Sequence, residues 1–142
     1  LDHLAADENL NLWLTFATDF EENYECARAA AGCLAMATQD KVIAEAFVEL
    51  KKFRQHTEML LECGRLEIMH RMFVLVHNLV AHGGKSKEKA ISEGLVAFCE
   101  AYVASYESGT SAQLEFTEQE RAMLPVTADV AMRVVQLADE DD

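Results

Sequence analysis

The sequence predicts an all-α fold. Residues that favour helix, chiefly Ala, Leu, Glu, Lys, Met and Gln, dominate the 142-residue chain. The chain has one proline and six glycines, and most of these stand where a helix is expected to begin or end. No segment alternates apolar and polar residues for long enough to indicate a β-strand. Apolar residues make up 51% of the chain, far more than a disordered segment contains.

In the N-terminal third, apolar residues recur every three or four positions, which is the spacing of one helix face. This pattern predicts helices over residues 7–17, 24–38 and 42–50. An acidic turn at residues 19–23 separates the first two helices, and Asp40 begins the linker to the third.

Glycines and the single proline delimit the remaining helices. We expect these over residues 53–63, 65–82, 88–93, 95–106 and 125–137. Gly64 is placed to end the first of them in the left-handed conformation, and Gly83 and Gly84 end the second. Gly94 precedes the fourth. Pro125 is expected to open the last, because a proline in the first turn loses no intrahelical hydrogen bond.

Four other segments have their own sequence signals. Residues 85–87 are expected to form a linker, and residues 107–114 a polar loop that is the best candidate for a mobile segment. Thr117 and Glu120 have the spacing of a capping box. The chain closes with an expected solvated acidic tail at residues 139–142.

The chain resembles itself at an offset of just over forty residues. An offset of 43 places Arg28 on Arg71, Ala30 on Phe73, Gly32 on Leu75 and Met36 on Leu79, and an offset of 44 places residues 46–49 on 90–93. A period of about 40–47 residues with two or three helices per unit is typical of armadillo and HEAT repeats. We therefore predict one domain, a right-handed α-solenoid of about three armadillo-type repeats, with units at 1–40, 41–84 and 85–142. A four-helix bundle would not need short helices at a fixed offset.

The charge of the chain excludes some kinds of partner. It has 12 basic and 25 acidic residues, a net charge of −13, which disfavours binding to nucleic acid or to an anionic membrane. Residues 1–40 carry −7, residues 41–89 carry +3 and the remainder carries −9. The basic middle either reflects solvated helix faces or forms a groove whose polarised lip orients an elongated partner.

The sequence offers little for catalysis or for a metal. Cys26, Cys33, Cys63 and Cys99 lie in helical patterns without a CxxC pair, so we expect buried free thiols in a reducing, cytoplasmic setting. No nucleophile elbow or glycine-rich phosphate loop is present. One ExxH pair joins Glu67 and His70, whereas a dimetal carboxylate bundle needs two such pairs and two more glutamates. We expect neither an enzyme nor a cofactor nor a metal site, and a metal-binding helical bundle is kept as an alternative.

The helix predicted over residues 65–82 has a polar arc beside its apolar one. Arg71, Asn78 and His82 share that arc, and Val74 and Leu75 border it. In a repeat protein, an asparagine on such a face can clamp the backbone of an extended peptide. The alternative is a solvated face with no partner.

Two other units contribute to the same predicted groove. Arg28 is the equivalent of Arg71, and Arg133 is the candidate in the third unit. The position equivalent to Asn78 in the first unit is Ala35, so a continuous asparagine ladder is absent. The predicted partner-binding groove consists of Arg28, Arg71, Val74, Leu75, Asn78, His82 and Arg133.

Three stretches, covering residues 10–37, 60–71 and 91–96, resemble the C-terminal part of the UCS-domain myosin chaperones, a family of armadillo-repeat proteins. The motifs are GCLAMA at 32–37, LLECGRLEIMHR at 60–71 and ISEGLV at 91–96. The resemblance implies a chain that binds the myosin motor domain along its groove and assists its folding. It also implies a tetratricopeptide module outside this chain that recruits a heat-shock chaperone. The missing initiator Met agrees with the tail of a longer protein.

Two further alternatives remain at this point. The chain can be a general armadillo adaptor for another protein, or a set of units that caps a longer solenoid and binds nothing itself.

Overall fold

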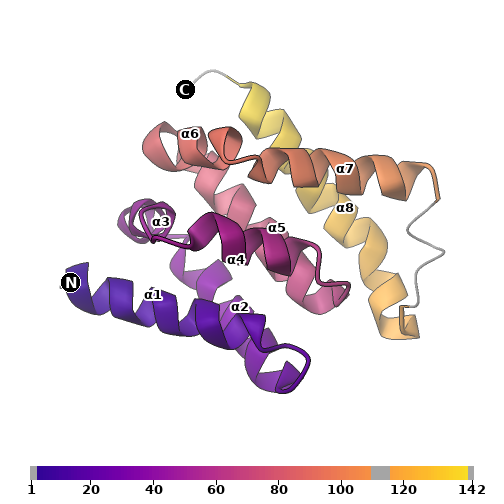
Figure 1. Ribbon diagram of the computed structural model, residues 1–142. Coiled ribbons are helices and arrows are strands. Elements are labelled where there is room, and N and C mark those ends of the chain that lie inside the picture. The colour runs from indigo at the N-terminus through magenta and orange to yellow at the C-terminus, as the bar shows by residue number, and fades with distance from the viewer. Residues whose placement is uncertain (1–2, 110–115, 141–142) are drawn as a thin grey trace.

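The computed structural model describes residues 3–109 and 116–140, and all the regular structure in these ranges is helical (Figure 1). The helices are α1 (His3–Thr18), α2 (Tyr24–Ala37), α3 (Lys41–Val48), α4 (Phe53–Leu61), α5 (Leu66–Ala81), α6 (Gly84–Ser92), α7 (Leu95–Glu107) and α8 (Glu118–Asp139). The predicted all-α class is confirmed. Most of the predicted 107–114 loop and the last two residues of the predicted acidic tail lie outside the described residues.

Local signals set most helix ends as the sequence predicts. Asp40 caps α3, since its side chain accepts hydrogen bonds from the backbone N–H groups of Val42 (2.8 Å) and Ile43 (3.2 Å). Gly64 has a φ of +78°, a conformation that residues other than glycine rarely adopt. It lies in the turn that follows the last residue of α4, Leu61. Thr117 and Glu120 form the predicted capping box at the start of α8.

The linker predicted at residues 85–87 is wrong, because these residues form the first turns of α6. Ser86 is fully buried, and its Oγ donates a hydrogen bond to the carbonyl of Leu79 (2.7 Å). Lys87 is also buried, and its Nζ donates to the carbonyl of Glu140. The segment lacks apolar residues, so no local pattern indicates that tertiary hydrogen bonds hold it as a helix.

The expected start of the last helix at Pro125 is also wrong. The capping box at Thr117 starts α8 seven residues earlier, and the helix continues through Pro125 to Asp139. Pro125 is exposed, so its ring meets solvent instead of the core. Proline has no backbone N–H, so the helix lacks the hydrogen bond from residue 125 to the carbonyl of Arg121. The packing of the long helix outweighs this loss of stability.

The helices form two layers (Figure 1). In one layer α4 contacts both α1 and α7, and in the other α5 contacts both α2 and α8. The short helices α3 and α6 contact each other at one end of the layers. Helices that hold the same position in successive predicted units therefore lie side by side.

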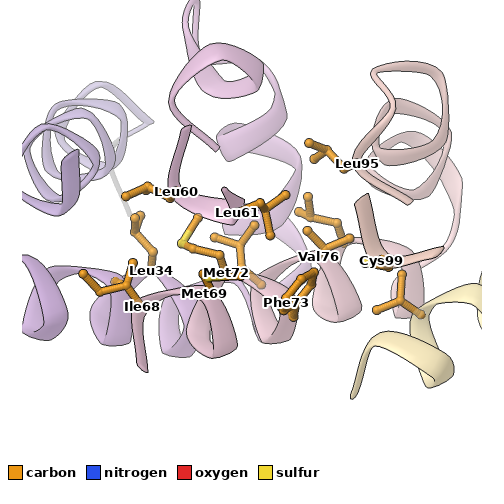
Figure 2. Packing of buried hydrophobic residues seen from close by; sticks show 14 of the residues in the cluster. Leu34, Leu60, Leu61, Ile68, Met69, Met72, Phe73, Val76, Leu95 and Cys99 are labelled. Carbon is orange, nitrogen blue, oxygen red and sulfur yellow. The ribbon is translucent and has the colours of Figure 1, made fainter. Parts of the chain in front are cut away.

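The core lies between the two layers and centres on α5 (Figure 2). Ten residues of this 16-residue helix are buried, and Phe73 packs its ring 5.0 Å from that of Tyr102 in α7. The labelled core residues are Leu34, Leu60, Leu61, Ile68, Met69, Met72, Phe73, Val76, Leu95 and Cys99. Because α2, α4, α7 and α8 all contact α5, the apolar side chains of this helix are buried against helices from all three predicted units.

The expectation of four buried thiols holds for Cys99 alone. Cys63 is half-buried, and Cys26 and Cys33 are exposed. The two exposed thiols share the side of α2 that faces away from α1 and α5, which no described helix covers. Separately, none of the helices in the described ranges combines the length and apolar character that crossing a lipid bilayer requires.

Replacing Pro125 by alanine should raise the free energy of unfolding by about 1–3 kcal/mol, because alanine restores the backbone hydrogen bond to Arg121 and favours helix. Urea denaturation measures the change. The neighbouring exposed Val126→Ala is the matched control and should stay within about 0.5 kcal/mol of the parent chain. An unchanged or lower value for Pro125→Ala would show that α8 is not continuous through this position.

Candidate functional site

The residues predicted for the partner-binding groove lie on or at the ends of α2, α5 and α8. Tyr24 at the start of α2 pairs with Glu67 at the start of α5, and Ala35 near the end of α2 pairs with Asn78 near the end of α5. Leu66 pairs likewise with Glu120 of α8. The three helices therefore run in the same direction, and their N-terminal ends meet.

A polar hollow of about 250 Å³ lies where these ends meet. Its lining residues are Tyr24, Glu25, Arg28, Arg65, Glu67, Thr117, Gln119 and Glu120. Two arginines and three glutamates thus share one small site. Such a mixture can bind a segment that carries both charges, and it can fix that segment's direction.

Tyr24 is the centre of this network. Its hydroxyl donates a hydrogen bond to Glu67 Oε2 (2.8 Å), and Arg28 Nη1 lies 3.5 Å from the same oxygen. The guanidinium of Arg65 stacks 3.7 Å above the tyrosine ring, a cation–π contact. Burial, followed by the hydrogen bond to Glu67, raises the pKa of Tyr24 to about 12, so the hydroxyl stays a donor at neutral pH.

Glu120 joins α8 to α5. Its Oε1 accepts from the N–H of Thr117 (3.0 Å), and its Oε2 accepts from the N–H of Leu66 (2.9 Å). One carboxylate therefore caps two helix starts. Burial opposes its ionisation, but the hydrogen bonds from Thr117 and Leu66, together with the charge of Arg65, outweigh that effect and lower the pKa of Glu120.

Asn78 is oriented differently from the prediction. It is only 9% exposed, and its Nδ2 donates to the carbonyl of Ala35 (2.8 Å) and to Oγ1 of Thr38 (3.1 Å). His82 Nε2 lies 2.9 Å from the carbonyl of Thr38. The asparagine does clamp a backbone, but it is the last turn of α2, whose terminal carbonyls lack helical partners. We therefore correct its assignment from partner contact to a link between α2 and α5.

The other residues predicted for the groove divide into three groups. Leu75 is fully buried, so its assignment to the groove is wrong. Arg71 is half-buried and lies across Gly32, where a β-carbon would come within 3.3 Å of its Nε. Val74 is half-buried on the outer face of α5, and Arg133 is exposed on α8.

Sequence reasoning named Arg28 as a binding residue but missed the polar hollow that it lines. Tyr24 and Glu67 are separated by 43 residues, the same offset at which the chain resembles itself, and this coincidence was the available signal. No sequence signal indicated that Arg65 belongs to this site. It joins the site through the contact of its guanidinium with the ring of Tyr24, which is tertiary.

Glu67 and His70 do not converge on a common ligand. Glu67 is bound to Tyr24 and Arg28, whereas His70 Nδ1 lies 2.9 Å from Oγ1 of Thr127 in α8. Burial, with a smaller effect from Arg71, lowers the pKa of His70. Within residues 3–109 and 116–140, no group of three or more His, Cys, Asp or Glu side chains is placed to hold a metal ion.

The less exposed cysteines are poor nucleophiles. Burial raises the pKa of the Cys63 thiol, and burial followed by the charge of Glu100 raises the pKa of Cys99 to about 12. Both stay protonated at neutral pH, and it is the thiolate that reacts.

The chain matches no family model, and no curated protein or solved structure shows significant similarity to it. The resemblance to the UCS-domain chaperones stays a prediction.

Asn78→Ala should lower the free energy of unfolding by about 2 kcal/mol, because it removes two hydrogen bonds and leaves the buried carbonyl of Ala35 without this donor. Thermal or urea unfolding tests this. Asn11→Ala, an exposed asparagine in α1, is the control and should change stability by less than about 0.5 kcal/mol. Equal effects of the two variants would contradict the linking role of Asn78.

Proposed function

We propose that this chain is a non-enzymatic protein-binding module, an α-solenoid of three armadillo-type units. An extended segment of a partner binds along the outer face of α2, α5 and α8. The support for the repeat architecture is that equivalent helices of the predicted units lie side by side and parallel. Such stacking gives repeat proteins the elongated surfaces on which they bind partners.

The observation that carries the proposal is the polar hollow at the N-terminal ends of these three helices. It lies at one end of a face that also presents Val74 and Arg71 of α5 and Arg133 of α8. Charged groups at one end and an apolar contact further along provide direction and affinity for an elongated segment. Asn78 does not contact the partner in this proposal, because it is bound to the end of α2. Recognition therefore depends on the other side chains of the face, without a row of asparagines that binds the partner's backbone.

The proposed partner is the myosin motor domain, and this step depends on the resemblance of residues 10–37, 60–71 and 91–96 to the UCS-domain chaperones. In this mechanism the face holds a partly folded segment of the motor while its core closes. A heat-shock chaperone is recruited through modules outside this chain. The proposed location is the cytoplasm, where myosin folds.

The test compares binding of a purified myosin motor domain with the parent chain and with two double variants. Val74→Asp removes an apolar contact from the proposed face, and Arg133→Glu reverses a charge on it. Together they should raise the dissociation constant for the motor domain at least about tenfold. Met59→Asp with Lys51→Glu is the control: it makes the same change in charge on and beside α4, in the other layer, where Met59 is 44% exposed.

Isothermal titration calorimetry gives the affinities, and thermal unfolding shows whether each variant is folded. Equal weakening by both folded variants would remove the proposed face from the interface. If the parent chain does not bind the motor domain at all, myosin is the wrong partner and a general armadillo adaptor replaces the chaperone proposal.

A further inference from the structure

The outer side of α7 and α8 carries an apolar hollow of about 350 Å³. Its apolar lining comes from Val103 and Ala104 of α7 and from Met132 and Val135 of α8. None of these four side chains is buried. An open apolar hollow between two helices has the shape of a site for a third helix.

A comparison of α5 with α8 shows how far a helix is covered inside the stack and at its end. Leu66 lies beside Glu120, 54 residues later, and His70 beside Thr127, 57 residues later. Val80 precedes Val135 by 55 residues, so the two valines lie at similar heights on the parallel helices α5 and α8. Val80 is 2% exposed within the stack, whereas Val135 is open. The hollow thus lies at the end of the row formed by α2, α5 and α8, where no further described helix packs on α7 and α8.

The rim of the hollow is acidic. Glu100 and Glu107 of α7 border it, and both are exposed. Asp139 follows Met132 by seven residues, or two helical turns, and so lies on the same side of α8. Among the described residues that line the hollow there is no lysine or arginine. A partner for this site therefore carries positive charge.

A second copy of the chain does not meet that requirement. The exposed apolar side chains at the other end of the stack belong to α1 and α2, and include Leu12, Phe16 and Met36. Residues 1–40 carry a net charge of −7 and residues 90–142 carry −9. Stacking these two ends would bring like charges together, at a cost in binding free energy.

We infer that the α7–α8 hollow binds an amphipathic helix of another protein, one whose apolar stripe is flanked by lysine or arginine. Large apolar side chains spaced three and four residues apart enter between Val103 and Met132. Glu100 and Glu107 are two turns apart, so basic residues at the same spacing on the bound helix lie opposite them. This site is on a different side of α8 from Arg133, so it works independently of the proposed myosin-binding face.

The probe is a fluorescein-labelled peptide of about 18 residues made of Leu, Ala and Lys, with Leu on one helical stripe and Lys beside it. Fluorescence anisotropy with the full chain should show saturable binding that weakens as salt increases. A peptide with Glu in place of Lys, and one with the same composition but a scrambled Leu pattern, should both bind at least about tenfold more weakly.

Glu100→Lys with Glu107→Lys should weaken binding of the basic peptide about tenfold or more. Glu21→Lys with Glu22→Lys makes the same change in net charge at the exposed α1–α2 turn and should leave the affinity within about twofold. Equal loss in both variants, or equal binding of the scrambled peptide, would show general attraction to an acidic chain and overturn the proposal. Failure of the basic peptide to bind the parent chain would also overturn the proposal. A further contradicting result would be self-association of the parent chain in sedimentation velocity that Glu100→Lys with Glu107→Lys abolishes, because the hollow would then bind a second copy.

Discussion

The register between α2 and α5 is the constraint on which the rest of this structure depends. The two helices meet through residues 43 positions apart, Tyr24 with Glu67 at one end and Ala35 with Asn78 at the other. Helices of this length are marginal in isolation, and each exposes backbone groups at its ends that need partners. Neighbouring helices supply those partners: Asn78 at the end of α2 and Glu120 at the start of α5.

This arrangement explains why binding surfaces arise where they do. Parallel helices in register bring three N-terminal ends together, and the side chains there form the polar hollow around Tyr24 and Arg65. The outer face of the same layer needs no partner for folding, so Val74 and Arg133 stay accessible. On the outer side of α7 and α8, where no further described helix packs, an apolar hollow with an acidic rim is left open. The proposed binding sites are thus consequences of stacking, one along the layer and one at its end.

Sequence patterns predicted the helices well because their signals are local. The cap at Asp40, the left-handed Gly64 and the capping box at Thr117 act within a few residues of themselves. The offset of 43 was also visible and matches the observed pairs of α2 and α5.

What the sequence could not give was the direction of a polar side chain between two units. Asn78 has the same position on a helical wheel whether it faces a partner or the end of α2, and only the distance to Ala35 decides between them. Ser86 appeared to belong to a linker because its buried hydrogen bond to Leu79 is tertiary. Cys26 and Cys33 appeared to belong to a core because small apolar residues surround them, yet no described helix covers that side of α2.

The most direct test of the account is a double-mutant cycle between Tyr24 and Glu67, two residues that touch only if α2 and α5 pack in the observed register. Tyr24→Phe, Glu67→Gln and the double variant are compared by urea denaturation. The account predicts a coupling of about 1 kcal/mol, as expected for a partly buried hydrogen bond to a charged group. Tyr24→Phe with Glu49→Gln is the control, since Glu49 pairs with Lys85 elsewhere, and its effects should add. Additivity of Tyr24 and Glu67 within about 0.3 kcal/mol would contradict the register, and with it the layer on which the proposed binding face is built.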